Sequence, residues 1–462
     1  MTQRSMETFA RNLWSHWKSR DDFLKAQKHV AGILALAFVG NNWPASYPRD
    51  ENENAAMFWV MNVVILVAAL VTLQHDANAS ARGIQPLSRD QTEEWKGWMQ
   101  WAFIMYHYFR ARFVYNEIRI FVSSYVFMTG WGNWQYFEKK RDFSLERAIS
   151  MWLRINYFPL LLCLVVGTKL DDFYIVPLHT TGFFVTMATA YVAHVLERFI
   201  KPAVQRNLAA IGISLLVHIL FYETKAVNFL KFFSDEIFFR FQADKYSTWF
   251  GILAGFGWSY VKKAIQFYNT TPPVTLHQNI VSATQGAAGL ALILFWYFMF
   301  GSIQDKFTYN PMHPYVFWIP VFGYLLMRNA SKYLTEVHSH ALEFFGRITL
   351  ETYVLQFHLF MCRDVKHIPI VIPGSGPTGH ILVKILNMLL TGAIFVAAAY
   401  YARQNTVVTQ DSVTDLMNLV RQYYRTGTWP SAEENEEGDV DVPLVRKQES
   451  SSSTNEGKND DV

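Results

Sequence analysis

The stretch from Trp95 to Tyr108 reads WKGWMQWAFIMYHY, and it passes from a tryptophan-rich border into an apolar interior. Tryptophan is enriched where a membrane meets water, whereas an ionisable residue inside an apolar run is costly and usually faces a cavity. Lys96 and His107 are eleven residues apart, so an α-helix places them on nearly the same face, about 16 Å apart along its axis. The stretch therefore predicts a helix with a cation at the membrane border and an imidazole at about half depth.

The composition of the chain indicates that this helix belongs to a multi-pass membrane protein. Of the 462 residues, 51% are hydrophobic and only 17% are charged, whereas soluble proteins carry about 25% charged residues. A net charge of +3 does not indicate a nucleic-acid binder. Cys163 and Cys362 lie in or beside apolar runs and support neither a disulfide framework nor a zinc site, so we expect no metal site.

Apolar runs of the right length predict an all-α bundle of ten to twelve transmembrane helices, since one helical span needs roughly 20 mostly apolar residues. The two shortest runs, 30–39 and 98–109, make the number of helices uncertain by two. The expected spans are 30–39, 58–74, 98–109, 118–137, 148–166, 173–195, 208–222, 248–262, 287–303, 314–327, 342–361 and 381–402.

The charged segments predict the orientation and the domain boundaries. Residues 1–28 are basic and form a cytoplasmic segment by the positive-inside rule, 29–403 form the membrane domain, and the acidic, serine-rich tail 431–462 is disordered and cytoplasmic. Twelve spans place the basic connectors 139–147 and 198–206 on the cytoplasmic side. The connectors 49–53 and 362–379 then lie on the opposite side.

Further polar residues lie inside the predicted spans. Asn116, Arg119 and Ser123 form one stripe, and Arg119 needs either an ion-pair partner or an anionic ligand. Arg347, Glu351 and His358 fall near one face at i, i+4 and i+11, where Arg347 and Glu351 can pair directly and Glu351 can influence the His358 side of a cavity.

Each of these residues also has a purely structural interpretation. Lys96 can extend to the lipid headgroups, and His107 can bond a neighbouring helix. His179 follows a proline and His313 precedes one, both at span borders. A single histidine in such a position is more often structural than catalytic. Histidines and buried charges on several helices predict a protonatable cavity, which occurs both in proton-coupled transporters and in membrane enzymes.

Several ordered motifs resemble the capsule, sialate and cell-wall O-acetylation family, which includes the Reduced Wall Acetylation proteins of plants and the sialate O-acetyltransferase of animals. The resemblance covers about residues 90–402. It rests on LSRDQTEEWKGWMQ at 87–100, MYHY at 105–108, VYNEIR at 114–119, MTGWGN at 128–133, PLHT at 177–180, FR at 239–240 with DKY at 244–246, YN at 309–310 with HPY at 313–315, and GRITLETY at 346–353 with QFH at 356–358.

The resemblance implies transfer of an acetyl group from cytosolic acetyl-CoA to a glycan or polysaccharide hydroxyl in the Golgi lumen, with the ER as the alternative membrane. The Lys96–x10–His107 spacing is also similar to the basic–x10–His pattern of the acyltransferase-3 group, in which the histidine is the base or handles the acyl group. The implied catalytic residues are His107, Glu351, His358 and His179, and the implied acetyl-CoA contacts are Lys96, Asn116, Arg119, Arg240 and Arg347.

One departure from the animal proteins of this family leaves the acceptor open. Those proteins carry a lumenal esterase-like domain with a Gly-Asp-Ser nucleophile, and this chain contains no Gly-Asp-Ser. The arrangement is similar to that of the plant proteins, so we expect acetyl to pass either directly to a glycan or to a separate lumenal O-acetyltransferase. The expected partners are membrane lipids, acetyl-CoA and this acceptor. No nucleic acid is expected as a partner. Two other functions remain open: a carrier of acetyl-CoA or another activated acetyl donor, and a scaffold subunit.

Overall fold

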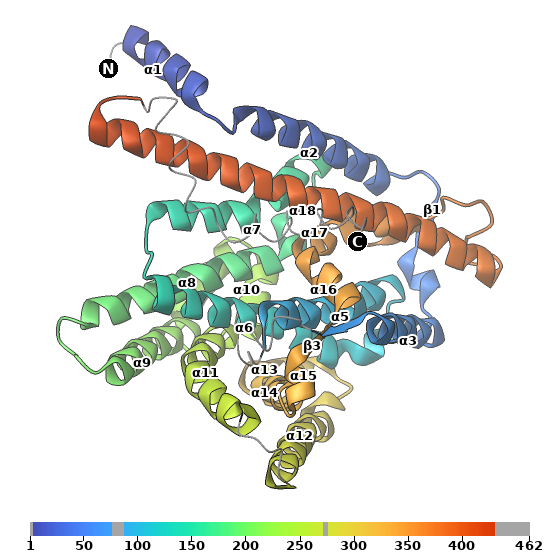
Figure 1. The fold of residues 1–462 in the computed structure, drawn as a ribbon. Coiled ribbons are helices and arrows are strands. Elements are labelled where there is room, and N and C mark those ends of the chain that lie inside the picture. Colours follow the sequence, from blue (N-terminus) through green and yellow to red (C-terminus); the bar gives the residue numbers. More distant parts are fainter. Residues whose placement is uncertain (1–2, 76–86, 271–275, 430–462) are drawn as a thin grey trace, which may run out of the picture. The chain divides into compact units, whose positions relative to one another are not determined.

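The computed structural model describes residues 3–75, 87–270 and 276–429, and helices make up most of them (Figure 1). The chain divides into two compact units, one formed by Met1–Gln27 with Val408–Val462 and the other by Lys28–Val407. The tail 431–462, which the sequence predicts to be disordered, lies outside the described residues.

The elements of the described residues are helices joined by short connectors. The α-helices are α1 (Gln3–His16), α2 (Arg20–Asn41), α3 (Ala55–Val71), α5 (Arg89–Tyr108), α6 (Tyr115–Lys140), α7 (Leu145–Val166), α8 (Ile175–Leu196), α9 (Ala203–Tyr222), α10 (Asp235–Ala243), α11 (Ser247–Thr270), α12 (Leu276–Trp296), α13 (Lys306–Val316), α14 (Trp318–Arg328), α15 (Lys332–Glu336), α16 (His340–Arg347), α17 (Thr349–Leu355) and α18 (Ile381–Thr426). The short elements are the strands β1 (Ser46–Pro48), β2 (Leu73–His75), β3 (Val337–Ser339) and β4 (His367–Pro369), the 3-10 turns η1 (Arg49–Asn52), η2 (Arg112–Val114), η3 (Leu170–Phe173) and η4 (Lys225–Phe232), and the π-turns η5 (Tyr297–Gly301) and η6 (Gln356–Phe360).

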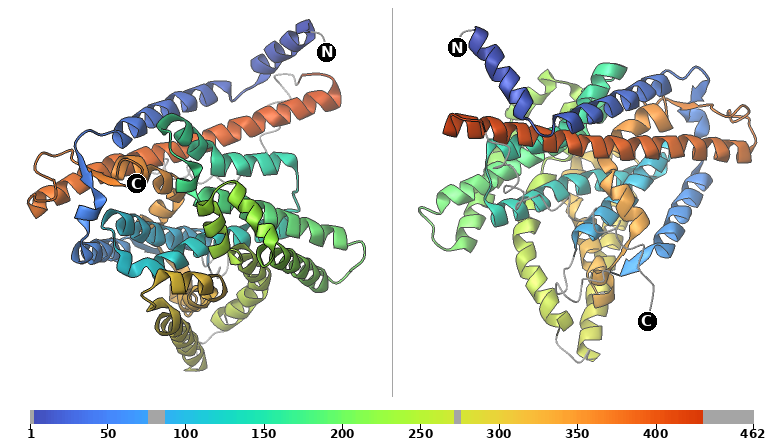
Figure 2. Two further views of the ribbon diagram at one scale, coloured as in Figure 1. Left: turned by 180° about the vertical axis from the view of Figure 1, so that it is seen from behind. Right: turned by 45° about the horizontal axis from the view of Figure 1, so that its top comes forward.

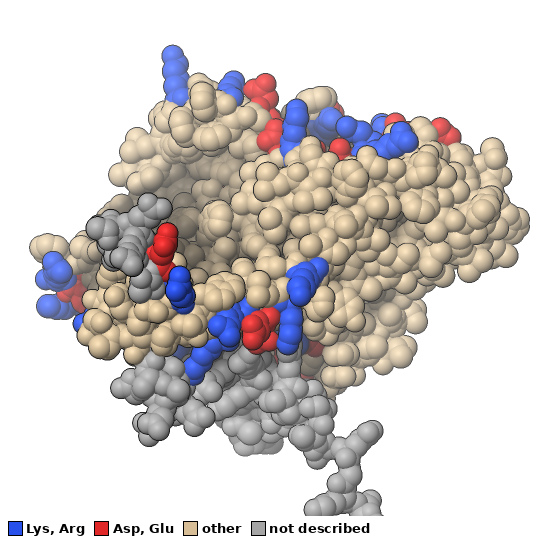
Figure 3. Space-filling model, turned by 90° about the horizontal axis from the view of Figure 1, so that it is seen from above, with Lys and Arg blue, Asp and Glu red and all other residues tan. Residues whose placement is uncertain are grey.

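Six helical segments of the described chain are long and apolar enough to cross a membrane, and the shorter helix α3 is apolar as well. The six are α2, α7, α8, α9, the stretch Gln278–Gly301 and α18. The helices α5 and α6 are more polar because they bury groups such as Gln100, Asn116 and Arg119. On the face drawn in Figure 3 the charged side chains gather in a few groups, and wide areas between them are uncharged. These features confirm the predicted all-helical, multi-pass architecture.

The larger unit is built around α5 and α6. Helix α5 packs against α3, α6 and α16, and α6 packs against α8 and α11 (Figure 1). Close approach of α16 to α5 requires glycine on both helices. A Cβ atom on Gly97 would lie 1.8 Å from the carbonyl oxygen of Leu342, and one on Gly346 would lie 1.8 Å from that of Glu93. Small residues permit such backbone contact between membrane helices, and here they fix α16 beside the Lys96 end of α5.

The predicted helix 342–361 is broken in the structure. Helix α16 ends at Arg347, Ile348 has φ −105° and ψ 18°, and α17 begins at Thr349 before widening into the π-turn η6. Because Arg347 and Glu351 lie on different helices, the spacing argument for their direct pairing fails.

The connectors of the larger unit join one another in two groups. Strand β1 pairs with β4, and the Arg49 N–H donates to the Lys366 carbonyl at 2.9 Å, so the connectors 49–53 and 362–379 meet. Arg141 and Arg206 both pair with Glu197, at 3.0 and 3.4 Å, so the connectors 139–147 and 198–206 meet as well. These are the two sets of connectors that the sequence assigns to opposite sides of a membrane.

The smaller unit pairs the start of the chain with the end of α18. The Trp17 indole N–H donates to the Ser412 carbonyl at 3.0 Å, and Ser19 donates to Asp415 at 2.9 Å. In the larger unit α2 and α18 continue side by side, where His29 Nδ1 lies 3.2 Å from Asn405 Oδ1 (Figure 2).

Candidate active site

Helix α5 carries the two residues on which the sequence argument began. A capping box starts it, because Ser88 accepts from the Gln91 N–H and the Gln91 side chain accepts from the Ser88 N–H. The helix then runs unbroken to Tyr108, so Lys96 and His107 are about 16 Å apart along its axis. Both side chains are half-buried. The helix thus presents them to two separate environments.

The Lys96 end of α5 contains a cluster of six charges. Lys96 Nζ lies 2.6 Å from Glu93 Oε2. Arg154 of α7 donates to the fully buried Glu351 of α17 at 2.7 Å. Arg403 of α18 interacts electrostatically with Arg154, Glu351, Glu93 and the exposed Arg89, and its Nη1 has no hydrogen-bond partner among the described residues. Arg403 and Arg89 therefore add two cations to two ion pairs, which leaves positive charge in surplus.

Arg154 and Arg403 were not among the residues predicted from the sequence. Arg154 lies inside the apolar run 148–166, and Arg403 directly follows the run 381–402. A charge in or beside an apolar run is the same signal by which Arg119 and Arg347 were predicted. Predicted Glu351 does lie in this cluster. His179 lies near it, since Lys96 interacts electrostatically with His179, whose Nδ1 is 2.5 Å from Thr129 Oγ1.

The His107 end of α5 is surrounded by arginine and aromatic side chains. Arg49 Nη1, from η1, lies 3.3 Å from His107 Nδ1. Arg240 of α10 interacts electrostatically with His107, and its Cζ lies 3.9 Å from the centre of the Tyr174 ring. Phe103, in α5, contacts the imidazole with ring centres 4.7 Å apart. The sequence predicted His107 and Arg240 but not Arg49, which follows a proline in a short connector and gave no signal.

Asn116 and Arg119 make their described contacts with protein groups. Asn116 Nδ2 donates to the carbonyls of Gly301 and Ile303, at 2.9 and 2.8 Å, at the end of η5. Arg119 Nη2 lies 2.9 Å from Asp244 Oδ2, and both side chains are buried. Arg119 thus has an ion-pair partner, while its Nε and Nη1 make no hydrogen bond with the described residues.

Asp244 continues this ion pair into a buried polar chain. Asp244 Oδ1 accepts from Ser123 Oγ at 2.5 Å, and Ser123 lies 2.7 Å from His313 Nε2. The Tyr309 hydroxyl oxygen lies 2.8 Å from His313 Nδ1 and completes the chain. The chain joins α6, α13 and the residue that follows α10, so it links three helical segments.

His358 lies apart from Glu351. Its Nδ1 is 3.0 Å from Asn41 Oδ1 and 3.8 Å from Asp364 Oδ1, and the side chain is fully buried. Glu351 instead bonds Arg154, and no hydrogen bond joins it to His358 in the described part of the chain. The predicted influence of Glu351 on the His358 side of a cavity therefore has no direct contact to act through.

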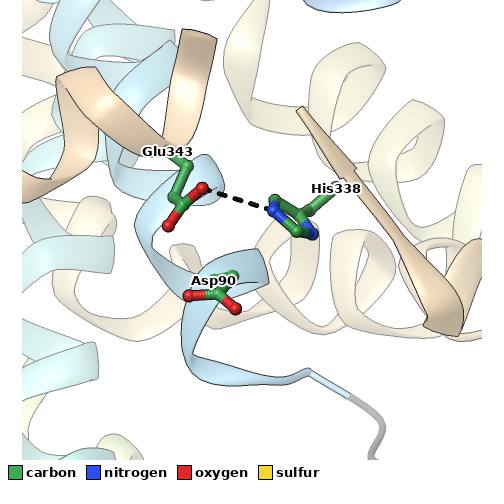
Figure 4. Close-up of side chains that lie close together, drawn as sticks. All are labelled: Asp90, His338 and Glu343. Atoms are coloured by element: carbon green, nitrogen blue, oxygen red, sulfur yellow. Dashed lines mark ion pairs between the residues drawn. The ribbon is translucent and has the colours of Figure 1, made fainter. Parts of the chain in front are cut away.

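Arg347 lies in a separate polar group and corrects the predicted pairing. Its guanidinium pairs with Glu343 rather than Glu351, and lies 3.7 Å from Asp90. His338 Nε2 lies 3.3 Å from Glu343 Oε2, and Asp90, His338 and Glu343 offer ligand atoms within 4.8 Å of one another (Figure 4). These residues have the chemistry of a metal site, but the Arg347 guanidinium already supplies a positive charge to both carboxylates.

The comparison with known families covers most of this arrangement, and Asn41 lies before the matched range. The family model described as "10 TM Acyl Transferase domain found in Cas1p" matches residues 49–419, which include all nine site residues predicted from the sequence. The N-acetylneuraminate (7)9-O-acetyltransferase of Danio rerio is 31% identical over 340 residues, which are 69% of this chain and 42% of that protein. The chain thus spans less than half the length of this curated relative. No solved structure matches it. The chain belongs to the ten-transmembrane acyltransferase family represented by the domain of Cas1p.

Proposed function

We propose that this chain is a membrane O-acetyltransferase that takes an acetyl group from cytosolic acetyl-CoA and delivers it to a glycan hydroxyl in the Golgi lumen. One observation carries the proposal: a single unbroken helix, α5, joins a cation cluster at Lys96 to an imidazole at His107. This arrangement suits acyl transfer, because cations can bind an anionic donor and a polar group can stabilise the charge that develops at the acyl group.

The surplus positive charge at the Lys96 end supports an anionic donor. Arginine and lysine bind phosphate through charge-assisted hydrogen bonds, and Arg403 has an unused donor there. Coenzyme A carries three phosphate groups on the side remote from its thioester. In this proposal Lys96, Arg154 and Arg403 attract those phosphates, while the thioester extends along α5 toward His107.

The acceptor is proposed from the relative and from the connectors that lie beside His107. The relative's name describes O-acetylation of N-acetylneuraminate, which supports a sugar hydroxyl as the acceptor class. The connectors 49–53 and 362–379 beside His107 are lumenal in this proposal, and both termini are cytosolic. A separate lumenal O-acetyltransferase is the alternative recipient, which then acetylates the glycan.

Release of CoA from acetyl-CoA by the purified protein in nanodiscs tests the proposal. We expect release by the intact chain, loss of release in His107→Ala, and a raised KM in Lys96→Ala because that change acts on donor binding. Liposomes that accumulate intact acetyl-CoA while none of the three proteins releases CoA would show a carrier instead. A scaffold subunit would release no CoA and accumulate no acetyl-CoA, and His107→Ala would be silent. Normal release by His107→Ala would place the chemistry away from His107.

A further inference from the structure

One nitrogen of the His107 ring is hydrogen-bonded to Arg49. The two atoms, Arg49 Nη1 and His107 Nδ1, are 3.3 Å apart with hydrogen-bond geometry. A guanidinium has only donors and stays protonated, so Nδ1 must be the acceptor. A neutral imidazole carries its single hydrogen on the other nitrogen. The hydrogen of His107 is therefore on Nε2, and a second ring proton would point an N–H at the guanidinium N–H groups.

The groups that face His107 agree with this tautomer. The charged residues acting on the ring are the two cations Arg49, from η1, and Arg240, from α10. The other neighbours are Phe103 and the titratable Tyr106 on α5 itself, and Phe357 of η6, with ring centres 4.7, 5.1 and 6.0 Å from that of the imidazole. Nε2 makes no hydrogen bond with any described residue, and the side chain is only half-buried. The Nε2–H group is thus available to a ligand.

We infer that Arg49 is a positioning residue that holds His107 in the Nε2–H tautomer, so that His107 serves acyl transfer as a hydrogen-bond donor to the acyl oxygen rather than as a base. This inference rests on the proposed function. It also departs from the sequence-based expectation, because both a base and a nucleophile would need a lone pair on Nε2, where the hydrogen lies.

The chemistry of the transfer has a use for such a donor. The acceptor oxygen bonds to the carbonyl carbon, the carbon–sulfur bond breaks, and its electron pair leaves on sulfur. The hydroxyl proton ends on that sulfur, directly or through water, so the products are an ester and the thiol of CoA. In between, the carbonyl oxygen becomes an oxyanion, which a preorganised N–H stabilises, and loss of one such donor costs about 10²–10³ in kcat.

The position of Arg49 is fixed by the connectors rather than by α5. Its backbone N–H donates to the Lys366 carbonyl at 2.9 Å, next to the β1–β4 pair. The guanidinium is half-buried, and its Nε has no hydrogen-bond partner among the described residues. Arg49 therefore reaches His107 from a paired, anchored segment, which suits a group that must hold one ring orientation.

His107→Gln tests the assignment, with His107→Ala as the reference. The glutamine amide can place an N–H near the position of Nε2 but cannot act as a base. We expect His107→Ala to lower kcat about 10²–10³-fold, and His107→Gln to stay within about tenfold of the intact chain with the same pH–rate profile. If His107→Gln is as inactive as His107→Ala, or if the intact chain has an acid limb that His107→Gln lacks, His107 is a base and the inference is wrong.

Arg49→Met and Arg49→Lys provide a second test that leaves His107 in place. Lysine can still donate to Nδ1, whereas methionine cannot. We expect Arg49→Met to lower kcat about tenfold, in the range of a charged hydrogen bond, with little change in the KM for acetyl-CoA, and Arg49→Lys to restore most of the activity. Equal activity of both variants with the intact chain would overturn the role of Arg49.

Different results would overturn the proposed acetyltransferase function and the donor role of His107. No CoA release by the intact, correctly folded chain would overturn the function and this inference together. Release by the intact chain with inactive His107→Gln would overturn only the donor role. Elution volume and apparent Tm of each variant separate these outcomes from misfolding.

Discussion

Arg403 has surroundings that favour the binding of an anion. It shares a cluster with two ion pairs that are already formed, and its Nη1 has no partner among the described residues. Hydrogen bonds to charged groups contribute about 1.5–3 kcal/mol each. We expect Arg403→Gln to raise the KM for acetyl-CoA about tenfold or more and to leave the KM for S-acetylpantetheine, which lacks the phosphates, unchanged.

Steady-state CoA or pantetheine release with the two donors measures this difference. Arg198→Gln is the matched control, because Arg198 is an exposed cation of the connector between α8 and α9. An equal rise of KM for both donors would place Arg403 outside the phosphate site.

Arg154 and Glu351 form the second test at the residue scale. Glu351 is fully buried and Arg154 is 19% exposed, and breaking such a pair by removing one partner costs about 3–5 kcal/mol. We expect Glu351→Gln to lower the apparent Tm clearly, and the double change Arg154→Met with Glu351→Leu to recover most of the loss because neither member of the pair is then left without its partner.

The exposed pair of Arg141 and Glu197 gives the comparison. Its side chains are 52% and 39% exposed, so Arg141→Gln should change stability by less than about 1 kcal/mol. Thermal unfolding followed by intrinsic fluorescence measures all of these variants. A double variant no more stable than Glu351→Gln would contradict the ion-pair account.

At the scale of elements, the contact between α5 and α16 determines where the Lys96 cluster lies. A Cβ atom added to Gly97 would overlap the Leu342 carbonyl oxygen. We expect Gly97→Ala to separate the two helices and to abolish folding or activity. Gly132→Ala, on α6, has nothing within 4 Å of its added Cβ, so it should be tolerated, with a gain of up to about 1 kcal/mol from helix propensity.

Size-exclusion elution and apparent Tm compare the two glycine variants. A stable, active Gly97→Ala protein would show that α16 does not pack on α5 as described.

Strand β3 and helix α16 also predict a pH dependence of stability. The hydrogen bond to Glu343 raises the pKa of His338 above its ordinary value. A raised pKa in the folded state stabilises the protein fully below the unfolded-state pKa of about 6.5, and this contribution is lost as the pH rises through the folded-state value. We expect the apparent Tm to fall from about pH 6.5 upward, and His338→Gln to weaken this dependence.

His194→Gln serves as the control for His338, since the His194 side chain is 48% exposed. EDTA should leave the apparent Tm unchanged, because Arg347 already supplies positive charge to Asp90 and Glu343. A Tm lowered by EDTA and restored by Zn²⁺ would instead show that Asp90, His338 and Glu343 hold a metal.

At the scale of the whole membrane domain, the two groups of connectors should lie on opposite sides. Single cysteines at Glu53 and Arg198, both exposed, in a chain with Cys163 and Cys362 replaced by alanine, should react with an impermeant maleimide from opposite faces of sealed vesicles. We expect labelling of Arg198→Cys from the cytosolic face and of Glu53→Cys from the lumenal face. Labelling of both from one face would refute the two-sided site.

The sequence by itself determined the features that depend on local geometry. Apolar length predicts membrane helices, and the fixed rise of an α-helix sets the spacing of Lys96 and His107, which an unbroken α5 preserves. The same local argument failed for Arg347 and Glu351, because Ile348 interrupts the helix whose regularity it assumed.

Only the tertiary structure decided which charges meet. Arg154 and Glu351 are 197 positions apart, and Arg49 and His107 are 58 apart, so no helical period relates them. Each buried charge must find a partner or a ligand, yet the sequence holds many candidates for every position. The packing of α7 on α17 and of η1 on the end of α5 selects among them, and with that choice it sets the hydrogen position on the His107 ring.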